Sequence, residues 1–351
     1  MTAPLRILHA ISSDRFAGVE QFVRRLAIRQ AQDGHTVAVF GGAAQHMAEP
    51  LGEAGVRWSV ADSTVAVLAA VRRHLGTADV VNSHMTAADV ASVAARATSR
   101  HTVPIIATRH FAQRRGTTGP GILYRTLERH IDAEISVSRT VADRAGVAST
   151  VIHPGVEPRA LPDPKARRNT VLVAQRLQDE KRTDVAVRAF ATSGIWQSGW
   201  NLEIAGTGPE HDHLVSSAAR LGIAEHVRFL GFRSDLDSLM GQAGMLFASA
   251  PFEHFGLTVL EAMAAGLPVV AAAAAGHVEM LHGFDDRALF TPGDVEGAAA
   301  RLRSLAADEH ARAVLGRAEH RRQVEEFSAR KQADATEAVY RRAIDLRGGG
   351  R

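Results

Sequence analysis

Short apolar runs typical of β-strands alternate with amphipathic helical segments along this chain, and no other feature limits its fold as much. In the first half the strand-like runs are residues 5–11, 36–40, 79–84, 104–110 and 133–137. After the first of them, apolar residues recur at the spacing of one helix face: Val19, Phe22, Val23, Leu26 and Ala27. Alternation of this kind predicts an α/β fold, in which helices cover both faces of a parallel sheet.

A proline-rich segment interrupts the alternation between residues 153 and 164 and is expected to be a linker. Strand-like runs then resume at residues 170–174, 201–205, 227–230, 244–248 and 268–272. A chain of 351 residues is also long for one hydrophobic core. The sequence therefore predicts two doubly wound, Rossmann-like domains, at 1–156 and 157–327. A C-terminal helix at about 328–347 is expected to pack back onto the first domain.

The composition excludes several classes of protein. An apolar share of 46% and a charged share of 23% are those of an ordinary globular domain. No apolar run approaches the roughly 18 residues that a membrane span requires. The first residues enter a strand without the charged-then-apolar pattern of a signal peptide. The absence of cysteine excludes disulfides, thiolate zinc sites and a cysteine nucleophile. We expect a cytoplasmic protein.

The chain carries a formal net charge of +3, and the positive excess lies in its first half. Five arginines contribute to it: Arg109, Arg114, Arg115, Arg125 and Arg129. Two interpretations stay open. The arginines form a solvated surface, or they contact an anionic acceptor or the inner face of a membrane, where each cation adds about 1 kcal/mol. Nucleic acid is not expected as a partner, because aromatic residues are only 5% and no binding motif is present.

Two glutamates, Glu253 and Glu261, flank a predicted helix start at Gly256. The N-terminus of a helix attracts anions, and carboxylates accept hydrogen bonds from hydroxyls. A ligand with negative charge in its middle and hydroxyls at both ends, such as a nucleoside diphosphate sugar, suits this pattern. Open α/β sheets bind ligands beyond the carboxyl ends of their strands, so we expect the site in a cleft between the two domains.

Four motifs in a fixed order carry a resemblance to a known family. They are Val171–Lys181, Leu202–Glu210, Val227–Phe232 and the E-x7-E segment Glu253–Glu261 with its continuation to Val270. In this order and spacing the chain resembles the retaining glycosyltransferases of family 4 over essentially its whole length. The resemblance implies the GT-B fold, two Rossmann-like domains facing each other across a cleft. It also implies a hexosyltransferase that moves a sugar from a nucleoside diphosphate sugar to a hydroxyl-bearing acceptor. The reaction is expected to keep the anomeric configuration of the donor and to need no cofactor.

The resemblance implies that Arg176 and Lys181 bind the diphosphate of the donor. Charge develops on the leaving phosphate oxygens, and a cation about 4 Å away stabilises it by roughly 4 kcal/mol at an effective dielectric near 20. Without the resemblance, an Arg-x4-Lys pair is usually a solvated surface pair. The backbone amides of Phe255, Gly256 and Leu257 are further candidate phosphate donors, since glycine permits close approach of a ligand.

The two glutamates receive different roles from the resemblance. Glu261 is expected to accept hydrogen bonds from both ribose hydroxyls, although a carboxylate in the first turns of a helix is also an ordinary stabilising feature. Glu253 is expected to approach the transferred sugar, either as a nucleophile or as a group that orients hydroxyls. The base of the donor (UDP, GDP or ADP), the sugar and the acceptor stay open, and the acceptor classes include small molecules, lipid-linked sugars and polysaccharides.

In the first domain the resemblance singles out residues that follow strands. Gly18 ends the loop after the first strand and is expected to bring backbone close to the diphosphate. His84 ends a later strand and matches a histidine that the family places near the donor sugar. Arg109 and His110, at the end of the next strand, are acceptor-side candidates. His84 has a purely structural alternative, because a single histidine beside a strand is most often part of the packing.

The chain departs from the family pattern at Gln175, Arg182 and His277, where glycines are usual. The changes at Gln175 and Arg182 are expected to reshape the diphosphate pocket without removing its cations.

Asp235 and Asp237 resemble the Asp-x-Asp metal site of another glycosyltransferase fold. Ser234 and Asp237 are better explained as a helix capping box, so no catalytic metal is expected. Two other functions remain as alternatives: a non-catalytic accessory or binding subunit of the same shape, and a nucleotide-sugar epimerase.

Overall fold

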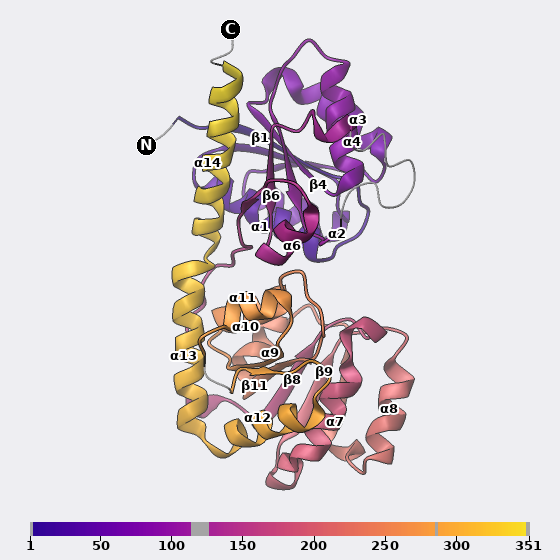
Figure 1. Ribbon diagram of the computed structural model, residues 1–351, viewed down its shortest axis with the longest axis vertical. Coiled ribbons are helices and arrows are strands. Elements are labelled where there is room, and N and C mark those ends of the chain that lie inside the picture. The colour runs from indigo at the N-terminus through magenta and orange to yellow at the C-terminus, as the bar shows by residue number, and fades with distance from the viewer. Residues whose placement is uncertain (1–2, 114–125, 285–286, 349–351) are drawn as a thin grey trace. The chain divides into compact units, whose positions relative to one another are not determined.

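The computed structural model describes residues 3–113, 126–284 and 287–348 of the chain. It divides into two compact units, unit 1 (Met1–Gly155 with Ala329–Arg351) and unit 2 (Val156–Ser328). Each unit contains a parallel β-sheet with helices on both faces (Figure 1). The predicted α/β class with two Rossmann-like sheets is therefore confirmed.

Unit 1 contains, within its described residues, a seven-stranded sheet of order β3-β2-β1-β4-β5-β6-β7. Its strands are β1 (Arg6–Ile11), β2 (Thr36–Phe40), β3 (Arg57–Ser59), β4 (Val80–His84), β5 (Ile105–Arg109), β6 (Ala133–Ser136) and β7 (Thr150–Val151). Its helices are α1 (Gly18–Gln32), α2 (Ala44–Glu53), α3 (Thr64–His74), α4 (Thr86–Ala97), α6 (Arg139–Ala145) and α14 (Ala329–Gly348). The edge strands β3 and β7 were not predicted, because two or three residues show no periodicity.

Successive residues of the unit 1 strands pack on opposite faces of the sheet. Ile7 lies in the cluster formed with α1, α2, α6 and α14, whereas its neighbour Leu8 packs against α3 and α4. The same division separates Val80 from Val81. A parallel sheet covered on both faces needs such continuous apolar runs, and this explains why the strands were visible in the sequence.

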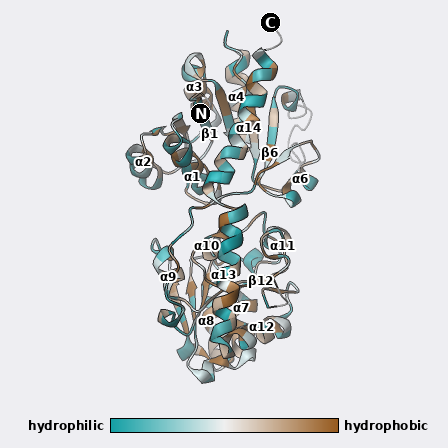
Figure 2. Cartoon of the chain, turned by 90° about the vertical axis from the view of Figure 1, so that its left-hand side faces the viewer, coloured by the Kyte–Doolittle hydropathy of each residue, from teal (hydrophilic) through white to brown (hydrophobic). Residues whose placement is uncertain are grey.

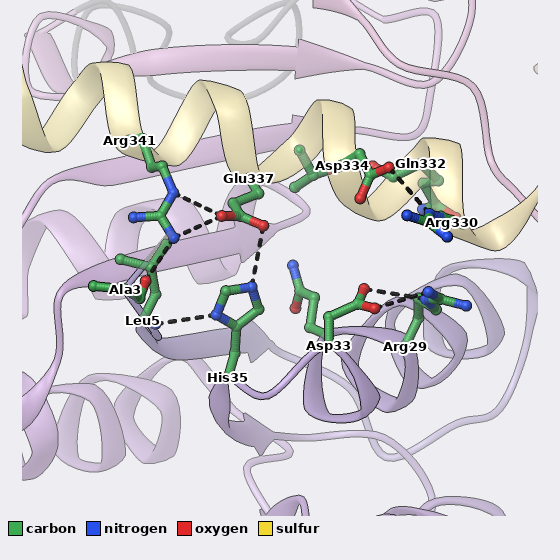
Figure 3. A network of polar contacts seen from close by, with 12 residues as sticks. Ala3, Leu5, Arg29, Asp33, His35, Arg330, Gln332, Asp334, Glu337 and Arg341 are labelled. Carbon is green, nitrogen blue, oxygen red and sulfur yellow. Dashed lines mark hydrogen bonds and ion pairs between the residues drawn. The ribbon is translucent and has the colours of Figure 1, made fainter. Parts of the chain in front are cut away.

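Helix α14, from the end of the chain, completes the core of unit 1. The backbone N–H of Leu5 donates to Nδ1 of His35 at 3.0 Å, so the ring proton lies on Nε2, which faces Glu337 Oε2 at 3.2 Å (Figure 3). Glu337 also pairs with Arg341, whose guanidinium donates to the carbonyl of Ala3 at 2.6 Å. Polar and apolar residues alternate along α14, as a helix with one buried face requires (Figure 2).

A buried hydrogen bond joins α14 to the middle of the sheet. Tyr340 is fully buried, and Asn82 of β4 donates its amide to the phenol oxygen. The amide oxygen of Asn82 accepts from Thr108 at 2.8 Å. Burial raises the pKa of the Tyr340 hydroxyl, so this group stays protonated.

Unit 2 contains, within its described residues, a six-stranded sheet of order β10-β9-β8-β11-β12-β13. Its strands are β8 (Thr170–Ala174), β9 (Asn201–Ala205), β10 (Val227–Gly231), β11 (Met245–Ala248), β12 (Val269–Ala272) and β13 (Leu289–Phe290). Its helices are α7 (Thr183–Ser193), α8 (His211–Arg220), α9 (Leu236–Gln242), α10 (Leu257–Ala264), α11 (Ala275–Leu281), α12 (Val295–Ala307) and α13 (Glu309–Glu326). Val171 packs with α7, α8 and α12, whereas the next residue, Leu172, packs with α9, α10 and α11.

The predicted capping box at Ser234 is wrong. Helix α9 begins at Leu236, its N-cap is Asp235, and no side chain caps it. Asp235 forms an ion pair with Arg233, and Asp237 forms one with Arg159. Hydrogen bonds from a guanidinium to a carboxylate are stronger than those from a backbone amide, so the arginines hold both carboxylates.

A carboxyl group that pairs with no cation among the described residues lies inside unit 2. Glu319 of α13 is fully buried, its Oε2 accepts from the backbone N–H of Val269 at 3.1 Å, and its Oε1 has no hydrogen-bond partner among the described residues. Burial raises the pKa of Glu319 well above its usual value. A carboxyl group whose pKa is raised on folding contributes its full stability to the fold below its unfolded-state pKa of about 4.3. This contribution to the free energy of unfolding is lost as the pH rises through the folded-state pKa.

We therefore predict that Glu319→Gln increases the free energy of unfolding by at least about 1 kcal/mol at pH 7.5, with a smaller gain at pH 4.5. Urea denaturation at both pH values measures the difference. Glu325→Gln, which changes an exposed glutamate of α13, is the control and should have no comparable effect. An equal gain from Glu319→Gln at both pH values would contradict the assignment.

Candidate functional site

Residues predicted to bind the donor or to approach its sugar lie beyond the carboxyl ends of two adjacent strands of unit 2, and His277, which was not predicted to do so, follows a third. Arg176 and Lys181 follow β8, Glu253 and Gly256 follow β11, and His277 follows β12. These three strands are neighbours in the sheet, and all of them run parallel. Their carboxyl ends therefore meet at one edge, where open α/β sheets hold their ligands.

Lys181 and Glu253 form an ion pair at this edge. The ammonium group of Lys181 contacts Oε1 of Glu253, and the two side chains are 17% and 20% exposed. The sequence predicted a role for each residue but not their contact. Because both side chains are largely removed from water, their charges are screened less than those of a surface pair.

Gln175, which stands where the family usually has glycine, holds the loop that carries Lys181. Its amide nitrogen donates to Oγ1 of Thr183 at 2.9 Å and to Oγ of Ser249 at 3.0 Å. Ser249 in turn donates to the carbonyl of Lys181 at 2.8 Å. Ser249 was not predicted; the signal that could have found it is a polar residue placed directly after the buried strand β11.

Arg176 lies in a different environment from Lys181. Its side chain is 66% exposed and pairs with Glu180, four residues later, at 3.3 Å. An exposed pair of this kind contributes no more than about 1 kcal/mol. Arg176 can therefore exchange Glu180 for another anion at little cost.

The loops after β11 and β12 are interlocked through two glycines. Gly256 precedes α10 with a φ of +103°, and a Cβ there would lie 2.8 Å from the His277 ring. A Cβ on Gly276 would lie 2.2 Å from the carbonyl oxygen of Phe255. The backbone N–H of Gly276 donates to the carbonyl of Glu253 at 3.1 Å. The position of Glu253 therefore depends on the start of α11.

The other predicted donor-binding residues of unit 2 lie at the start of α10 and on its first turns. The Phe255 side chain is buried and packs edge-to-face with Phe327, with ring centroids 5.9 Å apart, so only its backbone can face a ligand. Leu257 opens the helix and is half-buried. Glu261 lies on the same helix and is buried.

A chain of three buried histidines lies in unit 1. Nδ1 of His9 is 3.0 Å from Nε2 of His84, and Nδ1 of His84 is 3.0 Å from Nε2 of His110. At the inner end, Nε2 of His9 lies 2.8 Å from the side-chain oxygen of Gln30. An amide oxygen can only accept, so each ring donates from Nε2 to the next acceptor. His9 was not predicted, although a histidine inside an apolar strand was a visible signal.

Burial keeps the inner histidines uncharged. It lowers the pKa of His9 to about 4, and it lowers the pKa of His84 well below its usual value, with the neighbouring rings adding to the effect. Both ring nitrogens of His84 are hydrogen-bonded to the rings of His9 and His110. No ring nitrogen is therefore left for the predicted contact with the donor sugar. His110, 9% exposed, is the member of the chain nearest to solvent.

The structure does not favour the predicted acceptor-side role of Arg109. Its guanidinium is buried and forms ion pairs with Glu134 and, at 3.3 Å, with Glu128, so its charge is already balanced. Gly18 is exposed at the first position of α1, where its backbone can be approached. The remaining arginines of the basic group are Arg129, which is exposed, and Arg114, Arg115 and Arg125, which lie outside the described residues.

Two family models match the chain, one in each half. Residues 16–160 match the model described as Glycosyltransferase Family 4, and residues 159–322 match the model described as Glycosyl transferases group 1. The glycogen synthase of Mycobacterium tuberculosis is 30% identical over 311 residues, which are 81% of this chain and 75% of the relative. The D-inositol 3-phosphate glycosyltransferase of Mycobacterium marinum is 34% identical over 233 residues, 60% of this chain and 47% of the relative.

Solved structures show the same fold. The Anabaena protein Alr3699/HepE, in complex with UDP and glucose, is similar with a TM-score of 0.80 at 20% identity. The match covers 95% of this chain and 99% of that chain.

The interlocked glycines give a test of the site's architecture. Gly276→Ala places a methyl group 2.2 Å from the Phe255 carbonyl, so the loop that carries Glu253 must move. We predict a loss of about 1–3 kcal/mol in the free energy of unfolding, measured by urea denaturation. Gly241→Ala, on α9 with open space around it, is the matched control and should be neutral or slightly stabilising. Equal stability of the two variants would show that the loops are not interlocked.

The matches and the geometry agree. Both family models, and the alignment with the mycobacterial glycogen synthase, extend over the sheets and the motifs described above. The polar residues gather at the carboxyl edge of unit 2, where a fold of this class binds its substrate. The chain therefore belongs to glycosyltransferase family 4 and is a glycosyltransferase of the GT-B type.

Proposed function

We propose that this protein is a hexosyltransferase that moves a sugar from a nucleoside diphosphate sugar to a hydroxyl acceptor with retention of configuration. The Lys181–Glu253 pair carries the proposal, because it joins a phosphate-binding cation to a sugar-facing carboxylate beside the start of α10. The presence of UDP and glucose in the structure of the similar Anabaena protein supports a nucleotide-sugar donor.

The residues of unit 2 suit the departure of a diphosphate. Lys181 and Arg176 supply positive charge, and the first amides of α10, at Gly256 and Leu257, supply oriented N–H groups. Negative charge that develops on the leaving oxygen is stabilised by these groups more strongly than the donor in its ground state. Glu253, held by Lys181, is placed to accept hydrogen bonds from the transferred sugar, and Glu261 to accept them from the ribose.

We propose that the reaction uses no metal and no cofactor. The two aspartates of the Asp-x-Asp sequence, Asp235 and Asp237, are each engaged by an arginine, which supports this part of the proposal. The acceptor stays open between small molecules, lipid-linked sugars and polysaccharides. The name of the relative from Mycobacterium marinum, a D-inositol 3-phosphate glycosyltransferase, supports an anionic acceptor.

We further propose that the enzyme works in the cytoplasm, where nucleotide sugars are made, and that a lipid-linked acceptor would bring it to the inner face of the membrane. In the parts of the chain that the structure describes, no helix combines the length and the apolar character that crossing a bilayer requires.

Both cations are needed for turnover on this proposal. Lys181→Ala and Arg176→Ala should each lower kcat by about 100-fold, since removing one preorganised charge costs on the order of 3 kcal/mol of barrier. Release of nucleoside diphosphate from UDP-, GDP- and ADP-sugars measures the rate. Lys165→Ala, which changes an exposed lysine directly after the linker, should retain full activity. Near-normal turnover of Lys181→Ala would refute the assignment. If the wild type releases nucleoside diphosphate from none of these sugars, the result favours a non-catalytic subunit.

The stereochemical outcome is a separate prediction. With an α-linked donor, the product should carry an α linkage, because a retaining enzyme keeps the configuration of the anomeric carbon. Proton NMR of the product during the first turnovers, read from the anomeric coupling constant, measures this. A β-linked product would exclude retention.

A further inference from the structure

The cations around the donor site already have carboxylate partners. Lys181 pairs with Glu253, Arg176 pairs with Glu180, and Arg182 pairs with Asp184 at 2.9 Å. These pairs carry no net charge. A nucleoside diphosphate sugar brings two negative charges, so its binding either breaks ion pairs or brings a further positive charge into the site.

His277 is placed to supply that charge. Its side chain is only 2% exposed, and Nδ1 lies 3.0 Å from the carbonyl of Ala272. A carbonyl can only accept, so the ring proton lies on Nδ1 and Nε2 carries a lone pair. Nε2 has no hydrogen-bond partner among the described residues.

The unpartnered ring nitrogen is directed at the start of α10. A Cβ on Gly256 would lie 2.8 Å from Cδ2 of His277 and 3.0 Å from Nε2. This edge of the ring therefore packs on the residue that precedes the first free amides of the eight-residue helix. A buried side chain with an unused nitrogen beside a helix N-terminus is a second feature that fits an anion there, in addition to the helix itself.

The surroundings keep His277 uncharged before a ligand binds. Burial has the largest effect and lowers the pKa of His277, whereas the hydrogen bond to the carbonyl of Ala272 raises it. Glu253 also raises the pKa, and Lys181 lowers it. These are the charged groups that face the ring from the loops after β8 and β11. Two negative charges placed at Gly256 would reverse the balance, because an anion next to an imidazole favours its protonated form.

We propose that His277 takes up one proton from solvent when a nucleoside diphosphate sugar binds, and that its Nε2–H then donates to a phosphate oxygen at the start of α10. The ring passes from neutral to singly positive, and the proton returns to solvent when the nucleotide leaves. This inference rests on the proposed donor site.

Calorimetric titration tests the inference. UDP-glucose, GDP-mannose and ADP-glucose are each titrated into the protein at pH 7.0, in two buffers of different ionisation enthalpy. An intact nucleotide sugar has no phosphate group that titrates between about pH 6 and 8, so any proton uptake belongs to the protein. We expect uptake of up to one proton per site for the sugar that binds. The Kd should rise by up to tenfold between pH 6.5 and pH 7.5.

His277→Gln should abolish both the proton uptake and the pH dependence of Kd. His310→Gln, an exposed histidine on α13, is the matched control and should retain both. Carbon–proton NMR of the wild type gives an independent readout that does not depend on the variant's folding. The His277 ring signals should move to the imidazolium position when the sugar saturates the site.

The outcomes separate the two proposals. Binding without proton uptake, or uptake that persists in His277→Gln, overturns the role of His277 and leaves the donor site standing. Failure of all three nucleotide sugars to bind at any pH overturns the proposed donor site, and the role of His277 falls with it.

Discussion

The close approach of two backbone segments fixes the charged edge of unit 2. The carbonyl of Glu253 accepts a hydrogen bond from the backbone of Gly276, and the carbonyl of Phe255 lies so close to the same residue that only a glycine fits there. This contact sets where Glu253 stands, and Glu253 in turn holds Lys181. A network of uncharged groups, Gln175 and Ser249, positions the same lysine from the other side. The ion pair is thus held by backbone packing and hydrogen bonds as well as by its own attraction.

The two units deal with buried polar groups in different ways. In unit 1, His9, His84 and His110 donate in one continuous direction that ends at the side-chain oxygen of Gln30, and burial keeps the inner rings neutral. In unit 2, Lys181 and Glu253 form an ion pair, Glu319 keeps an unpartnered oxygen, and His277 keeps an unpartnered nitrogen beside the candidate site. Unmatched buried groups are costly in a purely structural role. That cost is the reason to look for function at His277 rather than at the centre of the histidine chain.

Much of this architecture could be predicted from the sequence, because the strands are buried on both faces and therefore read as continuous apolar runs. The start of α10 at Gly256 could be predicted from a glycine ahead of an apolar helix, and the structure agrees. The edge strands β3 and β7 could not be predicted, because two or three residues are too few to show a pattern of apolar residues. The prediction of a capping box at Ser234 was wrong for another reason. The arginines that hold Asp235 and Asp237 include Arg159, which is distant in sequence, and no local pattern reveals such a partner.

The candidate site was predictable in its composition but not in its contacts. Sequence motifs identified Lys181 and Glu253 separately, yet their pairing depends on the order of β8 and β11 in the sheet. Arg109 was a reasonable candidate from its place at a strand end. Only the fold shows that Glu128 and Glu134 already surround it. His84 likewise ends a strand, but its environment comes from His9 and His110 on neighbouring strands.

The return of α14 to unit 1 has a consequence for biosynthesis. The core of this unit contains Tyr340, yet the rest of the unit ends at Gly155, and all of unit 2 lies between them in the chain. Domains usually fold in the order in which the ribosome makes them. Here the second unit is complete while the first still lacks a helix. The unit that begins translation first is therefore the last to reach its final packing, because its core closes only when α14 has been made.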